Sequence, residues 1–352
     1  MSSAQTGGSG RPIIALTQGD PAGIGPEIIV KLLTRSKSAS VWRPLVIAER
    51  PALEALAAEV FDPIRNRLEY LTSPPSAQDL DRIPSDRIAV LDPVQIARVV
   101  EPGHSASKDA AGAVAAIDVA VDLAQSGVVD AIVTAPISKK SIAQHHLADF
   151  RGHTDYLAAK VGLTEYGRDY LMAFLAPDLQ VALLTTHLPI KTALNEIDAE
   201  KIVLALELLH RVAGGRIAVA GINPHAGEEG LLGREDQEIV KPAVCEARES
   251  GIDAYGPESA DSLFARARQG EFDWVLALYH DQGLIAVKTT SFGKATNWTL
   301  GLPFLRTSVD HGTAFDLAGR NAADAGPLEE VVATTIRLLS SELPRKKADR
   351  ST

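Results

Sequence analysis

The stretch PIIALTQGDPAGIGPEIIVKLLT (residues 12–34) decides the fold class. It begins with a short apolar run rich in β-branched residues, continues through a glycine-rich loop, and ends in an apolar pattern that opens with Pro26 and Glu27. Proline suits the first turn of a helix, and an acidic side chain there interacts favourably with the helix dipole. The stretch therefore predicts a strand, a loop and a helix in succession, which is the repeating unit of an α/β protein.

The same alternation of short β-rich runs and longer helical patterns continues along the chain. The runs predicted as strands are residues 12–17, 44–49, 87–92, 130–136, 180–186, 216–222 and 273–279. The stretches predicted as helices are residues 26–34, 107–126, 139–147, 153–162, 199–213, 235–250, 260–269 and 326–343. Alternation of this kind is typical of an α/β protein whose strands are mainly parallel.

Length and composition limit the classes of protein that fit. A chain of 352 residues suggests roughly two domains, and its 45% hydrophobic and 23% charged residues are ordinary for a globular protein. A net charge of −10 without a basic stripe argues against nucleic acid or an anionic membrane as a partner. No apolar run approaches the roughly 20 residues of a membrane helix. No signal peptide is visible and the single cysteine, Cys245, fits a reducing compartment, so a cytoplasmic location is expected.

Three of the nine histidines follow β-rich runs directly. His187 follows VALLTT, His225 follows AVAGINP, and His280 follows WVLALY. The carboxyl ends of parallel strands lie at one edge of a sheet, where ligands bind. Three imidazoles at that edge match a divalent metal site that keeps one position open for a substrate oxygen.

Two other interpretations of these histidines stay open, namely hydrogen-bonded strand-end side chains or a metal-free acid–base site. The sequence contains no H-E-x-x-H pattern and no cysteine pair, so the metal prediction rests on placement alone. Asp281 follows His280 and cannot share its face if the strand continues. It is predicted to support a metal ligand or to cap a turn.

Because the chain is acidic, cations inside motifs are the candidates for binding an anionic ligand. Lys288 and Arg306 lie at the edges of apolar segments, with Asn297 between them in the sequence. Arginine offers a planar fork to a carboxylate or phosphate, and lysine offers a point charge. The alternative for each is a solvated charge or a structural ion pair.

RGHTDYLA (residues 151–158) is a second candidate for anion binding, because it opens a predicted helix with His153 and Thr154. Free N–H groups at a helix start favour an anion, and the imidazole and hydroxyl groups could add hydrogen bonds. The alternative is an ordinary helix N-cap.

The expected nucleotide fingerprints are absent. The glycines of QGDPAGIGPE (residues 18–27) do not fit G-x-G-x-x-G, and FGKAT (residues 292–296) is not a P-loop. These motifs alone do not support a Rossmann dehydrogenase, and they leave the cofactor-binding residues unknown.

Five stretches together resemble one family, the 4-hydroxythreonine-4-phosphate dehydrogenases of pyridoxal phosphate biosynthesis. They are TQGDPAGIGPEI, GHTDYLA, TTHLP, NPHAGEEGLLGREDQEI and YHDQGLIAVK, with GLPFLRTSVDHGTAFDLAG extending the last. The resemblance covers about residues 12–340. It implies an α/β fold of two α/β/α domains sharing a mainly parallel sheet arrangement, similar to isocitrate and isopropylmalate dehydrogenases and unlike the Rossmann dinucleotide fold.

The resemblance also implies a domain division and an assembly. Residues 1–11 are expected to be a flexible tail, residues 12–138 and 299–345 a first α/β domain, and residues 139–298 a second, with the active site in the cleft between the domains. A homodimer is implied, with the metal site completed across the subunit interface by His280 of the partner subunit.

Carried over by motif, the resemblance places metal ligands at His187, His225 and His280. It places substrate contacts at His153, Thr154, Lys288, Asn297 and Arg306. Asp261, in SADSLF, matches an acidic residue near the site, and Asp261 and Lys288 are the candidates for catalytic proton transfer. The implied cofactors are NAD or NADP and one divalent metal ion, which is zinc, magnesium or cobalt.

The reaction implied is oxidation of 4-(phosphooxy)-L-threonine to 2-amino-3-oxo-4-(phosphooxy)butanoate, which decarboxylates to 3-amino-2-oxopropyl phosphate. The alternative is a paralogous dehydrogenase of threonate or erythronate 4-phosphate, because related enzymes of the same family oxidise four-carbon acid phosphates. Trp298, where a branched aliphatic residue is commoner, is a small departure from the family pattern. Two other classes are a metal-dependent hydrolase, which needs no nicotinamide, and a non-catalytic phosphometabolite-binding protein.

Overall fold

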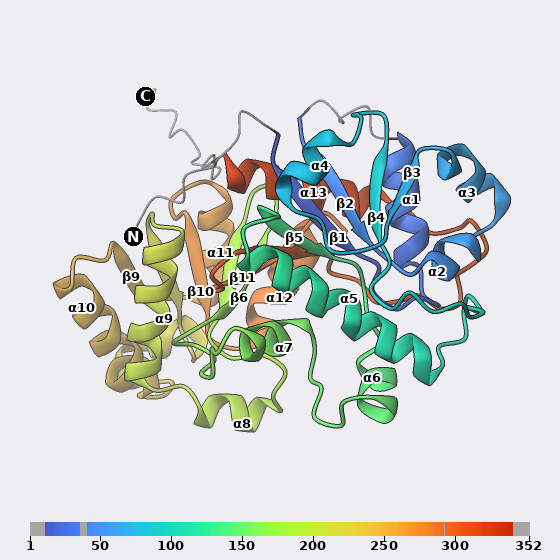
Figure 1. Ribbon diagram of the computed structural model, residues 1–352. Helices are drawn as coiled ribbons and strands as arrows, with labels where there is room; N and C mark the ends of the chain where they lie inside the picture. Colours follow the sequence, from blue (N-terminus) through green and yellow to red (C-terminus); the bar gives the residue numbers. More distant parts are fainter. Residues whose placement is uncertain (1–10, 36–40, 292, 341–352) are drawn as a thin grey trace. The chain divides into compact units, whose positions relative to one another are not determined.

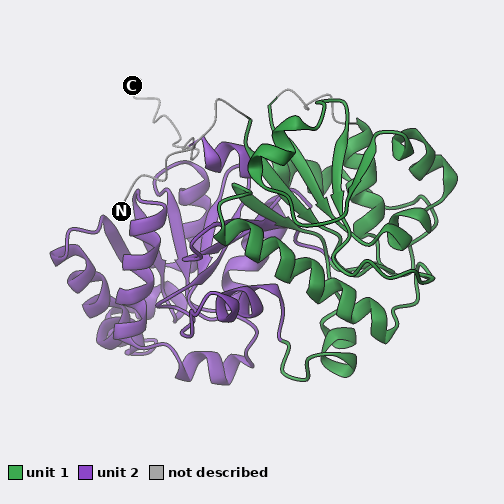
Figure 2. Ribbon diagram, viewed as in Figure 1, with its two compact units in different colours: residues 1–150, 312–332 green, residues 151–311, 333–352 purple. Residues whose placement is uncertain are grey.

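The structure is a computed structural model that describes residues 11–35, 41–291 and 293–340 (Figure 1). The chain divides into two compact units (Figure 2). Unit 1 comprises residues 1–150 and 312–332, and unit 2 comprises residues 151–311 and 333–352. The division therefore falls after Phe150 and after His311, where the sequence suggested residues 138 and 298. All but residue 11 of the expected tail lies outside the described residues.

Unit 1 contains a parallel sheet with the strand order β3-β4-β2-β1-β5. Its strands are β1 (Ile13–Thr17), β2 (Arg43–Ile47), β3 (Leu68–Leu71), β4 (Ile88–Leu91) and β5 (Ala131–Thr134). Every residue of β1 is buried, which is the environment of a central parallel strand covered on both faces. The predicted strand, loop and helix of residues 12–34 are confirmed, because β1 is followed by the glycine-rich loop and then by α1.

The helices of unit 1 are α1 (Gly25–Arg35), α2 (Arg50–Glu54), α3 (Ala58–Arg65), α4 (Ala77–Arg82), α5 (Ser107–Gln125) and α6 (Lys139–His145). The long helix α5 packs against β1, β2 and β5 through an alanine- and valine-rich face. A third boundary between the units, between Val332 and Ala333, falls inside α13 (Gly326–Leu339).

Unit 2 contains a mixed sheet with the strand order β12-β11-β6-β7-β10-β8-β9. Its strands are β6 (Leu171–Leu175), β7 (Gln180–Leu183), β8 (Ile217–Ala220), β9 (Ala254–Glu258), β10 (Trp274–Ala277), β11 (Thr296–Leu300) and β12 (Leu305–Ser308). The pairs β7/β10, β10/β8 and β8/β9 are parallel, and β6/β7, β6/β11 and β11/β12 are antiparallel. The prediction that the strands are mainly parallel therefore holds for unit 1, and in unit 2 it holds only for the neighbouring strands β7, β10, β8 and β9.

The helical segments of unit 2 are α7 (His153–Lys160), α8 (Ile190–Asn195), α9 (Ala199–Val212), the short turns η1 (Pro224–Gly230) and η2 (Asp236–Val240), α10 (Lys241–Glu249), α11 (Ala260–Arg268) and α12 (His280–Ser291). Successive strand residues point to opposite faces, so two apolar clusters form. One contains residues of α9 and α10, and the other contains residues of α11 and α12. Helix α12 thus covers the face of the sheet that carries Phe174 and Val181.

Helix α12 is the most consequential departure from the sequence analysis, which predicted no helix over residues 280–291 and considered a continuing strand at His280 and Asp281. The helix begins at His280 and is packed tightly against β7 and β10 at Gly283. A Cβ atom on Gly283 would lie 2.8 Å from side-chain carbons of both Val181 and Leu183. Glycine is therefore required where the helix axis comes close to the sheet.

Candidate functional site

The three candidate metal histidines lie at one edge of the unit 2 sheet. Strands β7, β10 and β8 are adjacent and parallel, so their carboxyl ends meet at the same edge. His187 follows β7, His280 follows β10, and His225 follows β8. The predicted placement of the histidines at one sheet edge is confirmed, and this is the edge where α/β proteins bind ligands.

Two of these histidines are close neighbours. The ring centroids of His187 and His280 lie 5.4 Å apart, with an angle of 44° between the ring planes. His280 is the first residue of α12, and its Nδ1 lies 2.8 Å from Oδ1 of Asp281. A carboxylate that accepts from Nδ1 holds the ring in the tautomer that leaves Nε2 free to accept. Asp281 therefore orients His280. On a continuing strand the two side chains would point to opposite faces and could not make this contact.

His225 lies in a left-handed turn. The φ angles of residues 225–229 are 54°, 52°, 79°, 40° and 56°, and Gly227 is the only glycine among the five. Each non-glycine residue in this conformation costs about 1–2 kcal/mol. Strain of this kind persists only where surrounding contacts impose it, and it is concentrated at functional sites.

The three histidines do not converge into a complete metal site within one chain. In the described ranges, no group of three or more His, Cys, Asp or Glu side chains is arranged to hold a metal ion. The three candidate ligands therefore share one sheet edge without forming such a group among the described residues.

Asp261 lies near His225, in the first turn of α11. The hydrogen bond from Ser259 Oγ, 2.7 Å from Oδ1 of Asp261, lowers the pKa of this carboxyl, and the nearby His225 lowers it further. A carboxylate with a lowered pKa is a weak base near neutral pH. Asp261 suits electrostatic support of the histidine edge better than proton abstraction.

A buried arginine lies on β12, the strand at one end of the unit 2 strand order. Arg306, on β12, is 1% exposed and donates from Nη1 to Oγ1 of Thr299 at 2.9 Å. Burial lowers the pKa of Arg306 to about 9, so the side chain stays positively charged at neutral pH. A buried cation is costly, and an anionic ligand would offset part of that cost.

Asn297 and Arg306 project from the same face of the sheet. Asn297 pairs with Ser308 across the antiparallel β11/β12 ladder, so Arg306, two residues before Ser308, shares its face. Asn297 also pairs with Phe174, whose side chain packs in the cluster that contains α12. Oδ1 of Asn297 is buried and has no hydrogen-bond partner among the described residues, so it is available to a ligand.

Lys288 is carried by α12, on this same face. Its Nζ lies 3.2 Å from Oδ2 of Asp310, and its side chain is 45% exposed. The ion pair holds the ammonium group in place while leaving it accessible. Lys288, Asn297 and Arg306 thus belong to elements on one face of unit 2, as a site for an anionic ligand requires.

His153 and Thr154 open α7, as predicted. The helix follows Gly152, and Thr154 is buried while His153 is half-buried. Oδ1 of Asp155 accepts a hydrogen bond from the hydroxyl of Tyr170 at 3.0 Å, which ties α7 to the start of β6. The helix start is therefore fixed relative to the sheet of unit 2.

Three residues with supporting roles were not found from the sequence: Asp310, Gln282 and Asp236. Asp310 pairs with Lys288, Gln282 bonds two backbone groups, and Asp236 is a fully buried carboxylate. Each lies within a stretch quoted for the family resemblance, close to a candidate ligand in the sequence. Their polar side chains inside these motifs were the only feature of the sequence that could have indicated a supporting role.

The glycine-rich loop of unit 1 lies at the carboxyl end of β1. Gly19 has a φ of +70°, and a Cβ atom there would lie 2.2 Å from the carbonyl oxygen of Pro136. Asp20 is buried and accepts hydrogen bonds from Ala22 N (3.0 Å) and Ser105 Oγ (2.8 Å). Burial raises the pKa of Asp20 to about 6. Between β1 and β5 the strand order reverses, which is the usual position for a ligand in a parallel sheet.

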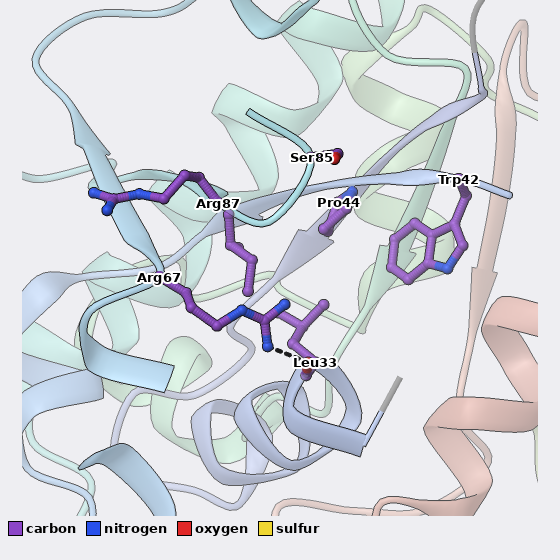
Figure 3. A pocket seen from close by; sticks show the side chains of 7 residues that line it. Leu33, Trp42, Pro44, Arg67, Ser85 and Arg87 are labelled. Carbon is purple, nitrogen blue, oxygen red and sulfur yellow. Dashed lines mark hydrogen bonds between the residues drawn. The ribbon is translucent and has the colours of Figure 1, made fainter. Parts of the chain in front are cut away.

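A small pocket in unit 1 lies away from these strand ends (Figure 3). It is lined by Leu33, Trp42, Pro44, Arg67, Ser85, Arg87 and Ile88, near the beginnings of β2 and β4. Arg67 donates to the carbonyl oxygens of Leu33 and Asp86, so its guanidinium supports the backbone. The pocket is therefore structural, and the candidate site remains in unit 2.

The family is shown by comparison with known proteins. A family model described as pyridoxal phosphate biosynthetic protein PdxA matches residues 40–335. The chain belongs to the PdxA family. The resemblance inferred from the five motifs is confirmed by this match. In the described residues of this PdxA protein, no helix has the length and apolar character needed to cross a membrane.

Curated relatives of this PdxA protein carry two different names. A 4-hydroxythreonine-4-phosphate dehydrogenase from Colwellia psychrerythraea is 37% identical over 94% of this chain and 99% of that protein. A D-threonate 4-phosphate dehydrogenase from Cupriavidus necator is 40% identical over 91% of this chain and 95% of that protein. Overall identity therefore does not separate the two substrates.

A solved structure shows the same PdxA fold. The 4-hydroxythreonine-4-phosphate dehydrogenase from Klebsiella pneumoniae superposes with a TM-score of 0.79 at 34% identity, covering 93% of this chain and 99% of that one. The mixed α/β fold with a large, mostly parallel sheet is thus shared with a PdxA relative. Relatives named as dehydrogenases imply a nicotinamide cofactor in general.

Proposed function

We propose that this protein is an NAD(P)-dependent 4-hydroxythreonine-4-phosphate dehydrogenase of pyridoxal phosphate biosynthesis. It oxidises 4-(phosphooxy)-L-threonine to 2-amino-3-oxo-4-(phosphooxy)butanoate, which loses CO2 to give 3-amino-2-oxopropyl phosphate. The observation that carries the proposal is the placement of three histidines after three neighbouring parallel strands of the mixed unit 2 sheet, in the same unit as a buried arginine on the α12 face. The three histidines, with a bound metal ion, suit an alcohol oxygen, and the buried arginine suits a phosphate or carboxylate.

The donor set fits a divalent cation. Imidazole nitrogen is a good ligand for zinc and cobalt and a poor one for magnesium, so His187, His225 and His280 favour the first two. The contact between His280 and Asp281 presents Nε2 of His280, as metal-binding histidines require. When bound, the cation would supply the Lewis acidity that lowers the pKa of the substrate hydroxyl, and the nicotinamide would supply the hydride acceptor.

The chain's own residues hold the substrate. Arg306 and Lys288 bind its phosphate and carboxylate, and Oδ1 of Asn297 accepts from its amino group or hydroxyl. His153 and Thr154 add hydrogen bonds from the start of α7. Lys288 is a candidate for catalytic proton transfer, because its side chain is accessible and is positioned by Asp310. The neutral amine could accept the hydroxyl proton, whereas the ammonium could only donate one.

We also propose a homodimer in which His280 of the partner subunit completes the metal site. Within the described part of one chain no group of three ligands is closed. Large apolar side chains are exposed next to the histidines, including Ile285 (65%), Ile190 (55%) and Leu188 (39%). Exposed apolar side chains beside an incomplete site fit burial against a second copy. Light scattering on the purified protein decides the assembly, and a monomer would contradict this proposal.

The second candidate function is oxidation of D-threonate 4-phosphate, since the Cupriavidus necator relative of that name is as similar as the others. The two substrates differ at the carbon next to the carboxylate, which bears an amino group in one and a hydroxyl in the other. A dehydrogenase of either kind would use the same histidine edge and the same anion-binding face.

The deciding experiment is a substrate panel on purified protein. The chelated protein is supplied with zinc, cobalt or magnesium and with NAD or NADP, and reduced nicotinamide is followed by absorbance. We expect turnover of 4-(phosphooxy)-L-threonine to exceed that of D-threonate 4-phosphate. The reverse order would establish the second candidate. Phosphate release without nicotinamide would establish a hydrolase, and binding without turnover of any substrate would establish a binding protein.

The remaining expectations are part of the same proposal. Kinship with isocitrate and isopropylmalate dehydrogenases fits a dehydrogenase whose strand–loop–helix start lacks the Rossmann fingerprint. A cytoplasmic location fits a biosynthetic enzyme with a single, exposed cysteine, Cys245.

A further inference from the structure

The backbone that leads from β8 to His225 is held by two side chains from other parts of unit 2. The carbonyl oxygen of Gly221 accepts a hydrogen bond from Nε2 of Gln282 at 2.7 Å. The next two backbone N–H groups, of Ile222 and Asn223, donate to Oδ1 and Oδ2 of Asp236 at 2.7 and 2.9 Å. Three consecutive residues are thus fixed by side-chain hydrogen bonds immediately before the left-handed turn.

Asp236 is enclosed by the turn that it holds. Its exposure is 0%, and its Oδ2 also accepts from Nδ2 of Asn223 at 3.0 Å. A Cβ atom added to Gly221 would lie 3.1 Å from Oδ1, and one added to Gly227 would lie 3.4 Å from Oδ2. A buried carboxylate is tolerated only when it is fully hydrogen-bonded, and here its bonds go to the segment that carries His225.

The strained turn needs such an anchor. Residues 225–229 adopt left-handed φ angles although most of them are not glycine, so the local sequence does not stabilise the turn by itself. Hydrogen bonds to a buried charged group are among the stronger ones in proteins. Asp236 therefore anchors the segment that leads into the turn.

Gln282 connects this segment to the second histidine segment. Its Oε1 accepts from the backbone N–H of Leu278 at 2.7 Å, while its Nε2 binds Gly221. Leu278 lies between β10 and His280. The side chain of Gln282 therefore bridges the carboxyl ends of β8 and β10, which lead to His225 and His280 respectively.

We propose that Asp236 and Gln282 are positioning residues. Both hold the segment that carries His225 into its left-handed turn, and Gln282 also holds the segment that presents His280 to the partner subunit in the proposed dimer. Neither side chain touches a ligand in this scheme. The consequence for metal affinity rests on the proposed function, whereas the consequence for the turn itself does not. Supporting side chains around metal sites commonly change metal affinity by about 10- to 100-fold when they are altered.

The test compares Asp236→Asn with Asp178→Asn, which alters an exposed carboxylate in the loop between β6 and β7. An amide at position 236 turns an N–H group toward backbone donors and loses the negative charge. We expect hydrogen exchange of the amides in residues 221–229 to quicken by about tenfold or more. The dissociation constant for Co2+, followed by its visible absorption, is expected to rise by about 10- to 100-fold. Asp178→Asn is expected to change neither quantity.

Gln282→Glu provides an independent variant of nearly identical size that loses the donor to Gly221. It is expected to change the same two quantities in the same direction, by less than Asp236→Asn, because it loses one bond, whereas the amide of Asp236→Asn keeps one acceptor oxygen and loses up to two. This variant also decides the proposal if Asp236→Asn fails to fold. A purely structural role would lower the melting temperature and leave the Co2+ affinity of the folded protein unchanged.

The outcomes separate the two proposals. Wild-type exchange in residues 221–229 and wild-type Co2+ affinity in both folded variants would overturn the positioning role. If the unaltered protein neither binds Co2+ nor reduces nicotinamide, the proposed function fails, and the exchange measurement still decides whether Asp236 and Gln282 hold the turn.

Discussion

The loop after β1 in unit 1 and the turn after β8 in unit 2 both contain positive φ angles and a nearby buried aspartate, but they differ in which residues adopt those angles. Each follows a parallel strand, at its carboxyl end, and each encloses a buried aspartate that accepts backbone hydrogen bonds: Asp20 in unit 1 and Asp236 in unit 2. The loop of unit 1 uses Gly19 where φ is positive, while the turn of unit 2 places His225 and three other non-glycine residues there. Backbone strain is thus absent from one loop and concentrated at the candidate metal ligand in the other.

The comparison shows that the two loops are destabilised by different contributions, a buried carboxyl group in unit 1 and backbone strain in unit 2. In unit 1 the cost is electrostatic, since burial raises the pKa of Asp20 to about 6 while glycine keeps the backbone relaxed. In unit 2 the cost is conformational, and a side chain useful for chemistry is gained where glycine would be easier to accommodate. Substitutions that remove one kind of cost should leave the other loop unaffected.

The largest expected effect comes from His225→Gly. Glycine removes the imidazole and accepts the left-handed conformation, so activity and stability should move in opposite directions. We expect kcat/KM to fall by at least about a hundredfold, with the free energy of unfolding unchanged or higher by about 1 kcal/mol. Steady-state kinetics measures kcat/KM, and urea unfolding measures the free energy of unfolding. A variant that keeps wild-type turnover would remove His225 from the site.

The next effect is the reverse exchange in unit 1, Gly19→Ala. Alanine would adopt a φ of +70° and bring its Cβ to 2.2 Å from Pro136 O, at the carbonyl that accepts from Asp20 N. We expect a loss of about 3 kcal/mol or more in the free energy of unfolding. Gly127→Ala is the matched control, because it has a similar φ of +72° but nothing within 4 Å of the added Cβ. Equal losses for both variants would mean that crowding at Pro136 is unimportant.

The third prediction concerns pH. The pKa of Asp20 is raised from 3.8 to about 6 in the folded protein, so the folded state binds the proton more tightly than the unfolded state does. The contribution of Asp20 to stability is therefore fully present below pH 3.8 and is lost as the pH rises through 6. Asp20→Asn removes this dependence while keeping an acceptor for Ala22 N and a donor toward Ser105.

We expect the stability of Asp20→Asn relative to wild type to rise by up to about 3 kcal/mol between pH 4 and pH 7 and then to level off. Urea unfolding at several pH values measures the difference. A difference that does not vary with pH would show that Asp20 is not the titrating group.

The smallest expected effect is that of Ala226→Gly, which relaxes the left-handed turn without removing a candidate ligand. Ala226 has a φ of 52°, so glycine should raise the free energy of unfolding by about 1 kcal/mol. Turnover should remain close to wild type, in contrast to His225→Gly. Loss of stability would show that the turn is not strained at this position.

The sequence was sufficient for the features that depend on local pattern. The strand–loop–helix start, the strands β1, β2, β4 and β5 of unit 1 and the placement of the three histidines beyond β7, β8 and β10 follow from alternation and placement. The parallel strands β3 and β9 were not predicted. The antiparallel strands β6, β11 and β12 were missed, because LMAFL lacks β-branched residues and TNWTL and LRTS are largely polar. Their conformation is set by neighbouring strands rather than by their own propensity.

The site details that could not be predicted depend on contacts between distant residues. The apolar run LIAV favours a strand, yet it lies in α12, where Gly283 lets the helix approach Val181 and Leu183. The segment that leads into the left-handed turn at His225 is held by hydrogen bonds from Ile222 N and Asn223 N to Asp236, a contact that periodicity does not reveal. Local patterns report which elements form, whereas hydrogen bonds at the sheet edge decide how the side chains are presented.

Helix α12 has a further consequence, because it carries His280 in its first turn and Lys288 two turns later. Eight residues of α-helix separate their Cα atoms by about 12 Å. Close packing at Gly283 prevents this glycine from acting as a hinge, so the distance between the two side chains is fixed mechanically. The helix works as a rigid spacer: substitutions can change the chemistry at either end, but only an insertion or deletion within the helix can change the length between them.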